Sequence, residues 1–100
     1  MILLSEMNLS EYDQRQLSLM GEMLDLYSSN KISLKKLIDN LEGLLFCLQS
    51  IDIEWKNCFH EYWFVLEQVY AVASFRNENI DPDDPDIQES LKQLRRLLKS

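Results

Sequence analysis

Acidic side chains gather between residues 77 and 87, in the run N-E-N-I-D-P-D-D-P-D-I, which contains two prolines and no basic residue. Three kinds of chemistry suit such a run: a metal-binding loop, a capped helix start surrounded by solvated charge, or a surface that binds a cationic partner. A calcium loop of the EF-hand type beginning at Asp81 would need glycine at its sixth position and glutamate at its twelfth. The chain has Asp86 and Lys92 there, so the sequence disfavours a calcium site.

Catalytic groups are sparse elsewhere. His60 is the single histidine, and Cys47 and Cys58 lack the spacing of a zinc site or a redox pair. Cys58 and His60 are two residues apart, so on a helix they would point to different faces. Glu61 and Glu67 could form an acid–base pair, but the polar side of a helix is the more ordinary place for them. We therefore expect a protein that is not an enzyme, with no metal and no cofactor, and with two reduced, buried cysteines.

Two of the clustered acids have a local structural role. Asp84 is expected to cap a helix that begins at Pro85, and Asp86 would add negative charge to the first turn, where the helix dipole favours it. Glu78, Asp81 and Asp83 are not needed for either purpose. The residues alone leave two interpretations open: a solvated loop, and a binding surface for a basic partner.

The net charge of −7 supports a basic partner over an acidic one. Nucleic acids and anionic membranes are bound through Lys and Arg, so neither is expected to bind directly. No secretion signal or membrane span is recognisable, which favours a cytoplasmic protein.

The elements that must position these residues are helical. With only two glycines and two prolines, the 100-residue chain suits long helices in one domain, residues 1–100. Residues 10–28, 33–50, 52–77 and 84–99 are predicted to form helices capped by Ser10, Ser33, Asp52 and Asp84. Their short connections predict an all-α, antiparallel four-helix bundle. Residues 1–9 are expected to form a frayed extension or a short extra turn.

The apolar spacing predicts which faces are buried. In the first helix the inward residues are expected to be Tyr12, Leu19, Met20, Met23, Leu24 and Tyr27. In the third helix they are Trp55, Phe59, Tyr62, Trp63, Leu66, Val69, Tyr70 and Ala73. Cys58, Phe64, Val65 and Val72 widen that apolar arc, which predicts a central helix with neighbours on more than one side.

Three passages resemble the small all-helical bacterial immunity proteins, in particular those of the colicin D immunity type and of contact-dependent growth inhibition. They are L-D-L-Y-S-S-N-K-I-S-L-K-K-L (24–37), W-F-V-L-E-Q-V-Y-A-V-A (63–73) and the acidic run itself. The first is similar to the family's turn between its first two helices, the second to its third helix, and the third to its acidic linker. The likeness covers residues 19–98.

The resemblance implies a cognate partner, a basic nuclease toxin domain that cleaves tRNA, bound by one monomer of this chain. Acidic side chains would occupy the cleft in which the toxin holds RNA phosphates. The residues expected to contact the toxin are Glu78, Asp81, Asp83, Asp86 and Glu89, with Glu61 and Glu67 extending the surface. Two other classes remain open: an adaptor or regulatory bundle that binds a basic protein or peptide, and a helical homo-oligomer packed through the third helix.

Overall fold

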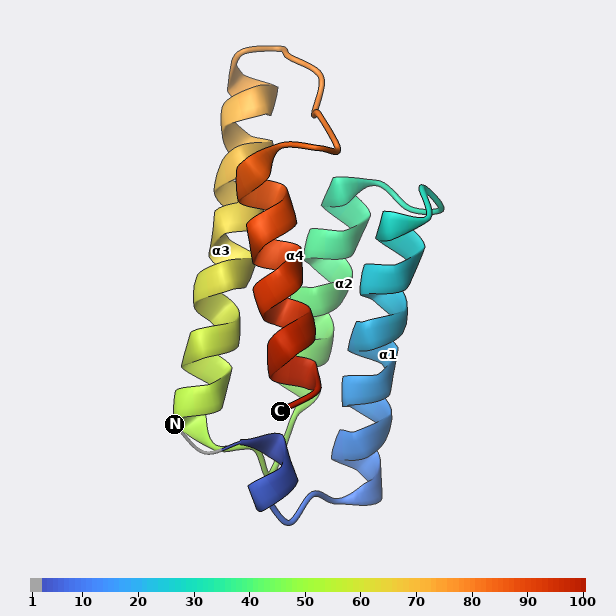
Figure 1. Ribbon diagram of the computed structural model, residues 1–100, viewed down its shortest axis with the longest axis vertical. Helices are drawn as coiled ribbons and strands as arrows, with labels where there is room; N and C mark the ends of the chain where they lie inside the picture. Colours follow the sequence, from blue (N-terminus) through green and yellow to red (C-terminus); the bar gives the residue numbers. More distant parts are fainter. Residues whose placement is uncertain (1–2) are drawn as a thin grey trace.

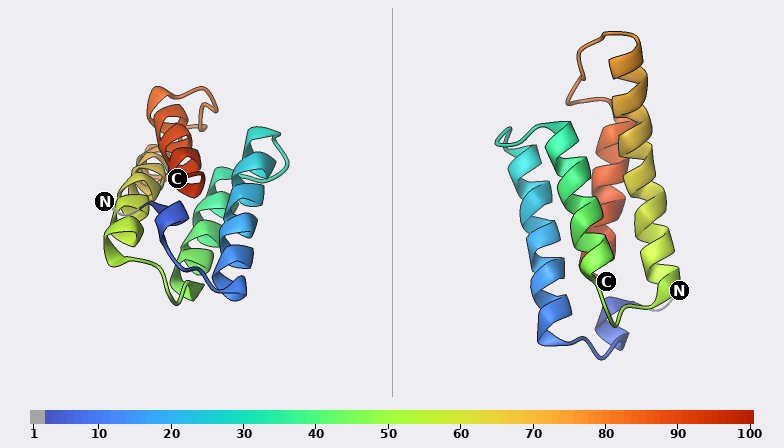
Figure 2. Two further views of the ribbon diagram at one scale, coloured as in Figure 1. Left: turned by 60° about the horizontal axis from the view of Figure 1, so that its bottom comes forward. Right: turned by 180° about the vertical axis from the view of Figure 1, so that it is seen from behind.

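Four α-helices form the body of the protein in the computed structural model, which describes residues 3–100 (Figure 1). A short 3₁₀ turn, Leu4–Glu6, precedes α1 (Glu11–Ser28), α2 (Leu34–Cys47), α3 (Ile53–Phe75) and α4 (Pro85–Leu98). The helices alternate in direction, and each packs against the next, with α4 returning to contact α1 (Figures 1 and 2). The predicted all-α, antiparallel four-helix bundle is confirmed.

The four predicted helix starts are also confirmed. The Ser10 and Ser33 hydroxyls accept hydrogen bonds from the backbone N–H groups of Asp13 and Lys36, each at 3.1 Å. The Asp52 and Asp84 carboxylates accept from the N–H groups two residues later, at 2.9 and 2.8 Å. Each cap satisfies N–H groups that the helix itself leaves without an acceptor.

The core is made by one apolar stripe from each helix. Its fully buried members include Met20, Leu24, Leu37, Leu41, Trp55, Phe59, Leu66, Ile87 and Leu94. The indole N–H of Trp63 donates to the Ile38 carbonyl at 2.9 Å, and that of Trp55 donates to the Leu97 carbonyl at 3.3 Å. The two tryptophans therefore connect α3 to α2 and to α4, and both indole N–H groups have an acceptor.

The predicted inner face of α1 is partly wrong. Asp13, Leu17, Met20 and Leu24 are buried, whereas Tyr12 and Leu19 are exposed. Met20 and Leu24 were predicted correctly, but the buried face also contains the charged Asp13, and apolar spacing placed its neighbour Tyr12 there instead.

Asp13 is fully buried and joins α1 to the link between α2 and α3. Its two carboxylate oxygens accept from the N–H groups of Gln49 and Ser50, at 2.9 and 2.8 Å. The expected end of the second helix near Ser50 is therefore too late, since the chain leaves the helix after Cys47 and presents these N–H groups to Asp13.

The wide apolar arc of α3 does not have neighbours all around it. α3 packs against α2 and α4, but Phe64 and Val72 are exposed. The expected central helix with neighbours on more than one side is confirmed, but these two members of its apolar arc lie outside the contacts with α2 and α4.

The N-terminal segment lies against the C-terminus. The Leu4 N–H donates to the Ser100 hydroxyl at 3.2 Å, and the Ser5 N–H donates to the Ser100 carbonyl at 3.0 Å. Leu4 is itself buried, which agrees with the short extra turn expected for this segment. Residues 1 and 2, also covered by that expectation, lie outside the described residues.

Candidate protein-binding site

The end of α3 and the link to α4 form a corner that extends beyond the α1–α2 connection (Figure 1). α3 has 23 residues, against 14 in each of α2 and α4, so it overhangs the bundle at this end. Asn77 follows the helix with a φ of 54°, and the Glu78 N–H donates back to the Ala73 carbonyl at 2.8 Å. This left-handed termination turns the chain sharply and sends it toward α4.

The link is held by its own hydrogen bonds. The Asp81 carboxylate accepts from the Asp83 N–H at 2.9 Å, and the Asp84 N–H donates to the Asp81 carbonyl at 3.0 Å. The Gln88 amide donates to the Pro82 carbonyl at 2.6 Å. With two prolines restricting the backbone as well, the acidic side chains project from an ordered turn.

A groove of about 430 Å³ lies between the overhanging part of α3 and this link. Its apolar lining comes from Val65, Val69, Val72, Ala73 and Ile80. Its polar lining comes from Gln68, Arg76, Glu78, Asn79, Asp81, Asp84 and Asp86. A lining that combines apolar side chains with carboxylates can hold the aliphatic stem of an Arg or Lys while pairing its charge.

The predicted carboxylates of the link and of early α4 do come together at this end. We call Glu78, Asp81, Asp83, Asp86 and Glu89 the acidic corner; all five are exposed. The ion pairs that form among residues 3–100 are Lys35–Asp39 and Arg95–Asp25, neither of which involves the corner. Glu89 accepts a hydrogen bond from the Gln93 amide at 2.9 Å, which is a neutral partner. Arg76 lines the same groove but forms no ion pair with the corner, so within residues 3–100 the five carboxylates are not paired with a cation.

The structure does not bring Glu61 and Glu67 to the same place. Glu61 is fourteen residues before Phe75, about 21 Å along the helix at 1.5 Å per residue. Glu67 is close enough to Lys35 of α2 to act on it: the pKa of Lys35 is raised first by its hydrogen bond to Asp39, then by the charge of Asp39, and less by Tyr70 and Glu67. These two glutamates lie outside the acidic corner.

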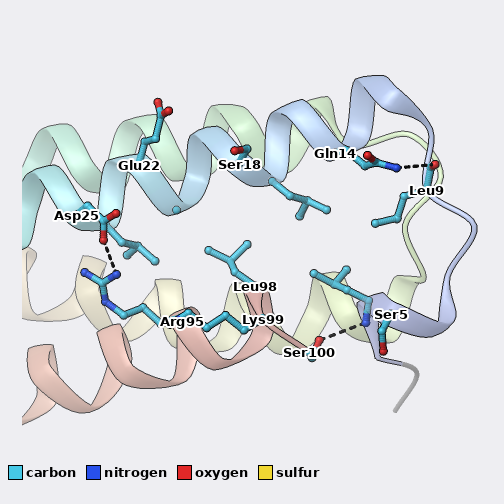
Figure 3. A pocket seen from close by; sticks show the side chains of 14 residues that line it. Ser5, Leu9, Gln14, Ser18, Glu22, Asp25, Arg95, Leu98, Lys99 and Ser100 are labelled. Carbon is cyan, nitrogen blue, oxygen red and sulfur yellow. Dashed lines mark hydrogen bonds and ion pairs between the residues drawn. The ribbon is translucent and has the colours of Figure 1, made fainter.

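A second groove, of about 680 Å³, separates α1 from α4 (Figure 3). Arg95 bridges it at one end, donating to Asp25 at 2.6 Å and to Ser28 at 2.9 Å. The Ser100 contacts described above close the other end. Leu98 faces its interior, while the Glu22 carboxylate points away (Figure 3). It brings no catalytic pair of side chains together, so we regard it as an imperfectly packed seam of the bundle.

Sequence reasoning missed both grooves. Nothing in the sequence marked Arg76 and Ile80 as lining residues, because their place in the groove beside the corner depends on how the chain turns at Asn77. The opening between α1 and α4 includes Gly21, where a methyl group would meet no atom within 4 Å. A glycine at mid-helix was the available signal for missing side-chain volume at that position.

The remaining candidates for chemistry are separate from one another. His60 is exposed, with its ring centre 4.9 Å from that of Trp63 and 6.4 Å from that of Phe64. Both cysteines are free, but Cys47 is exposed and Cys58 half-buried, so the expectation that both are buried is wrong. Within residues 3–100, no group of three or more His, Cys, Asp or Glu side chains is placed to hold a metal ion.

Comparisons with protein-family models, curated proteins and solved structures found no match to this chain. The likeness to immunity proteins therefore stays a prediction based on the three passages that suggested it. In the part of the chain from residue 3 to 100, no helix has both the length and the apolar character that crossing a membrane requires.

Proposed function

We propose that this protein is an immunity protein that binds and neutralises a cognate nuclease toxin, specifically a nuclease that cleaves tRNA. It does so by placing its acidic corner over the toxin's basic cleft. The observation that carries the proposal is the group of exposed carboxylates on an ordered turn with no internal cation partner. Five like charges in this space repel one another in the free protein, and a cationic surface would relieve that repulsion.

The ordered turn lowers the entropic cost of binding. A flexible acidic tail would lose conformational freedom on meeting its partner, whereas Asp81, Pro82 and Gln88 already fix the link in the free protein. The carboxylates are therefore presented in a set geometry, as phosphates are along an RNA backbone.

The groove beside the corner supplies an apolar component. Val72 and Ile80 line the same groove as Asp81 and Asp86, so the aliphatic stem of a toxin Arg or Lys can pack on the apolar pair while its charge pairs with a carboxylate. Charge-assisted hydrogen bonds of this kind are about twice as strong as neutral ones. Complementary charge also speeds capture, which suits a cytoplasmic inhibitor that must act before the toxin cuts.

The test is co-expression of the chain with a panel of toxic nuclease domains, scored by cell survival and by co-purification. We expect one panel member to be neutralised and to co-purify with one chain per toxin domain. The double variant Asp81→Lys with Asp83→Lys should lose protection and weaken binding by at least about 100-fold.

The matched control is Glu22→Lys with Glu42→Lys, which makes the same change in net charge at exposed positions of α1 and α2. It should protect as well as the original chain. Equal losses in the two double variants would mean that net charge, and not the corner, governs binding. Full protection by the Asp81→Lys, Asp83→Lys variant would remove the corner from the interface.

The adaptor alternative uses the same surface and differs in its consequence. A basic protein that co-purifies through the corner, but whose activity is unchanged by binding, would support an adaptor and contradict immunity. The survival assay separates the two, because an adaptor gives no protection.

A further inference from the structure

The outer face of α3 carries large apolar side chains that no other helix covers. Ile53, Phe64 and Phe75 are 65%, 46% and 92% exposed. Figures 1 and 2 show α3 at the edge of the molecule, with no helix beyond it on that side. Single exposed apolar residues are ordinary on protein surfaces, so their arrangement decides whether they matter.

The arrangement is regular. Ile53, Phe64 and Phe75 are separated by eleven residues each. Eleven residues are close to three helical turns, so successive members drift by only about 20° around the axis. The same line continues through further exposed residues: Asn57, His60, Gln68 and Ala71. We call these seven residues the outer stripe. Such spacing is typical of a helix that packs along its length against another helix.

The positions of the outer stripe are spaced symmetrically about Phe64, which is the central residue of α3 (Ile53–Phe75). A twofold axis beside Phe64 would place it against the partner's Phe64. The same axis would place Ile53 against the partner's Phe75 at each end. We infer that two copies of this chain associate through α3, with the two helices antiparallel. A twofold interface requires a self-complementary surface of this kind.

The polar residues along the two edges of the stripe agree with this arrangement: His60 and Gln68 belong to it, and Glu67 and Glu61 lie just outside it. At 100° per residue, His60 and Glu67 lie on one flank of the stripe, and Glu61 and Gln68 lie on the other. The antiparallel twofold places each flank against the same flank of the partner. His60 then lies beside the partner's Glu67, and Glu61 beside the partner's Gln68. Both pairs are complementary, and neither sets two carboxylates directly opposite each other.

The acidic corner selects antiparallel over parallel packing. It follows Phe75 at one end of the stripe, and each chain carries a net charge of −7. Parallel helices would set the two corners side by side. Antiparallel helices separate them by about the length of the stripe, roughly 33 Å at 1.5 Å per residue. That separation is several times the Debye length of about 8 Å at physiological ionic strength.

The inference goes beyond the proposed function and does not rest on it. The groove beside the acidic corner is lined by Gln68 of the outer stripe but not by Phe64 or Phe75, and no carboxylate of the corner belongs to the stripe. Two copies joined by the outer stripe would leave both corners open, so each could bind its own basic partner. The expected monomer would then be one half of a dimer.

Sedimentation equilibrium of the purified chain tests the association. We expect the mass to rise from 11.9 kDa to twice that value as the concentration increases to about 0.5 mM, where a Kd in the micromolar range gives mainly dimer. Phe64→Glu would place two carboxylates at the axis and should weaken association by at least about 100-fold. The control Phe46→Glu alters a phenylalanine that is 81% exposed at the end of α2 and should change nothing. A constant monomer mass, or equal effects of the two variants, would overturn the inference.

Cysteine cross-linking tests the direction of the helices. In a background of Cys47→Ser with Cys58→Ala, Phe64→Cys should form a disulfide-linked dimer with itself under mild oxidation. Ile53→Cys and Phe75→Cys should cross-link when mixed, and neither should do so alone. Self-linking of Ile53→Cys would show parallel helices and contradict the inference. The Phe64→Glu variant should still bind a basic partner through its corner, so failure of the dimer and failure of the proposed function are separate results.

Discussion

Asp13 shows how one buried charge can organise a small bundle. Its carboxylate is fully buried, and it is stabilised by backbone N–H groups, without a cation in its hydrogen-bonding set. Two charge-assisted hydrogen bonds offset part of the cost of removing it from water. They also determine where the chain leaves α2 and how it enters α3.

We predict that Asp13→Ala lowers the free energy of unfolding by about 3 kcal/mol, because the N–H groups of Gln49 and Ser50 lose their acceptors. Asp13→Asn should cost less, since an amide keeps one oxygen acceptor. Urea denaturation of both variants measures the difference. Glu22→Ala, at an exposed position of α1, is the control and should stay within about 0.5 kcal/mol of the original.

The same residue scale accounts for the acidic link. Asp84 caps α4, and Asp81 accepts a hydrogen bond within the link. These two carboxylates therefore have structural roles in addition to their negative charge. Asp83 and Asp86 use no side-chain oxygen in a hydrogen bond within the described residues, so Asp83→Lys with Asp86→Lys leaves the Asp81 turn intact and should weaken toxin binding as the Asp81→Lys, Asp83→Lys variant does.

At the scale of elements, the end of α3 decides the shape of the candidate site. Asn77 adopts a left-handed backbone conformation, and the Asn77 and Glu78 N–H groups donate to the Ser74 and Ala73 carbonyls. α1 ends in the same way at Asn30, with a φ of 60°. Asparagine tolerates this conformation better than most residues because its short side chain can bond locally.

We predict that Asn77→Ala destabilises the protein by about 1 kcal/mol, because alanine has the same β-carbon strain in the left-handed conformation but lacks the amide with which asparagine tolerates it. Asn77→Gly removes that strain and should be neutral or slightly stabilising. Thermal unfolding of the two variants gives the comparison. A loss of stability from glycine equal to that from alanine would contradict the role given to the backbone conformation here.

At the scale of the whole molecule, the two ends of the chain close one end of the bundle. Ser100 accepts the N–H groups of Leu4 and Ser5, which holds the 3₁₀ turn against α4. Removing Ser100 should therefore speed hydrogen exchange at the Leu4 and Ser5 amides, while the amides of mid-α3 keep their protection. Exchange measured by NMR tests this; unchanged rates at Leu4 and Ser5 would show that apolar packing of Leu4 suffices.

The uneven charge of the molecule predicts how binding responds to salt. The electric field of the acidic corner attracts a basic partner before contact, and dissolved salt screens this long-range attraction. We expect the association rate with the toxin domain found by co-expression to fall at least about tenfold between roughly 50 mM and 500 mM NaCl. Stopped-flow fluorescence measures it. The Asp81→Lys, Asp83→Lys variant should show a flatter dependence, whereas Glu22→Lys with Glu42→Lys should retain most of it.

Local sequence signals determined the helices, their starts and the acidic character of the corner. Ser10, Ser33, Asp52 and Asp84 act on N–H groups within three residues, so their capping is a property of short segments. Short links between amphipathic helices then leave the antiparallel bundle as the compatible architecture.

Only the tertiary structure decided the rest, because the partners involved are distant in sequence. Asp13 acts on residues 36 and 37 positions later, which made a polar residue part of the buried face of α1. Phe64 is exposed because α3 packs against α2 and α4 but has no helix on its outer side within residues 3–100. The groove exists because the backbone at Asn77 turns the chain toward α4. Apolar periodicity reports how much of a helix could be buried, while the packing of the other helices decides which part is.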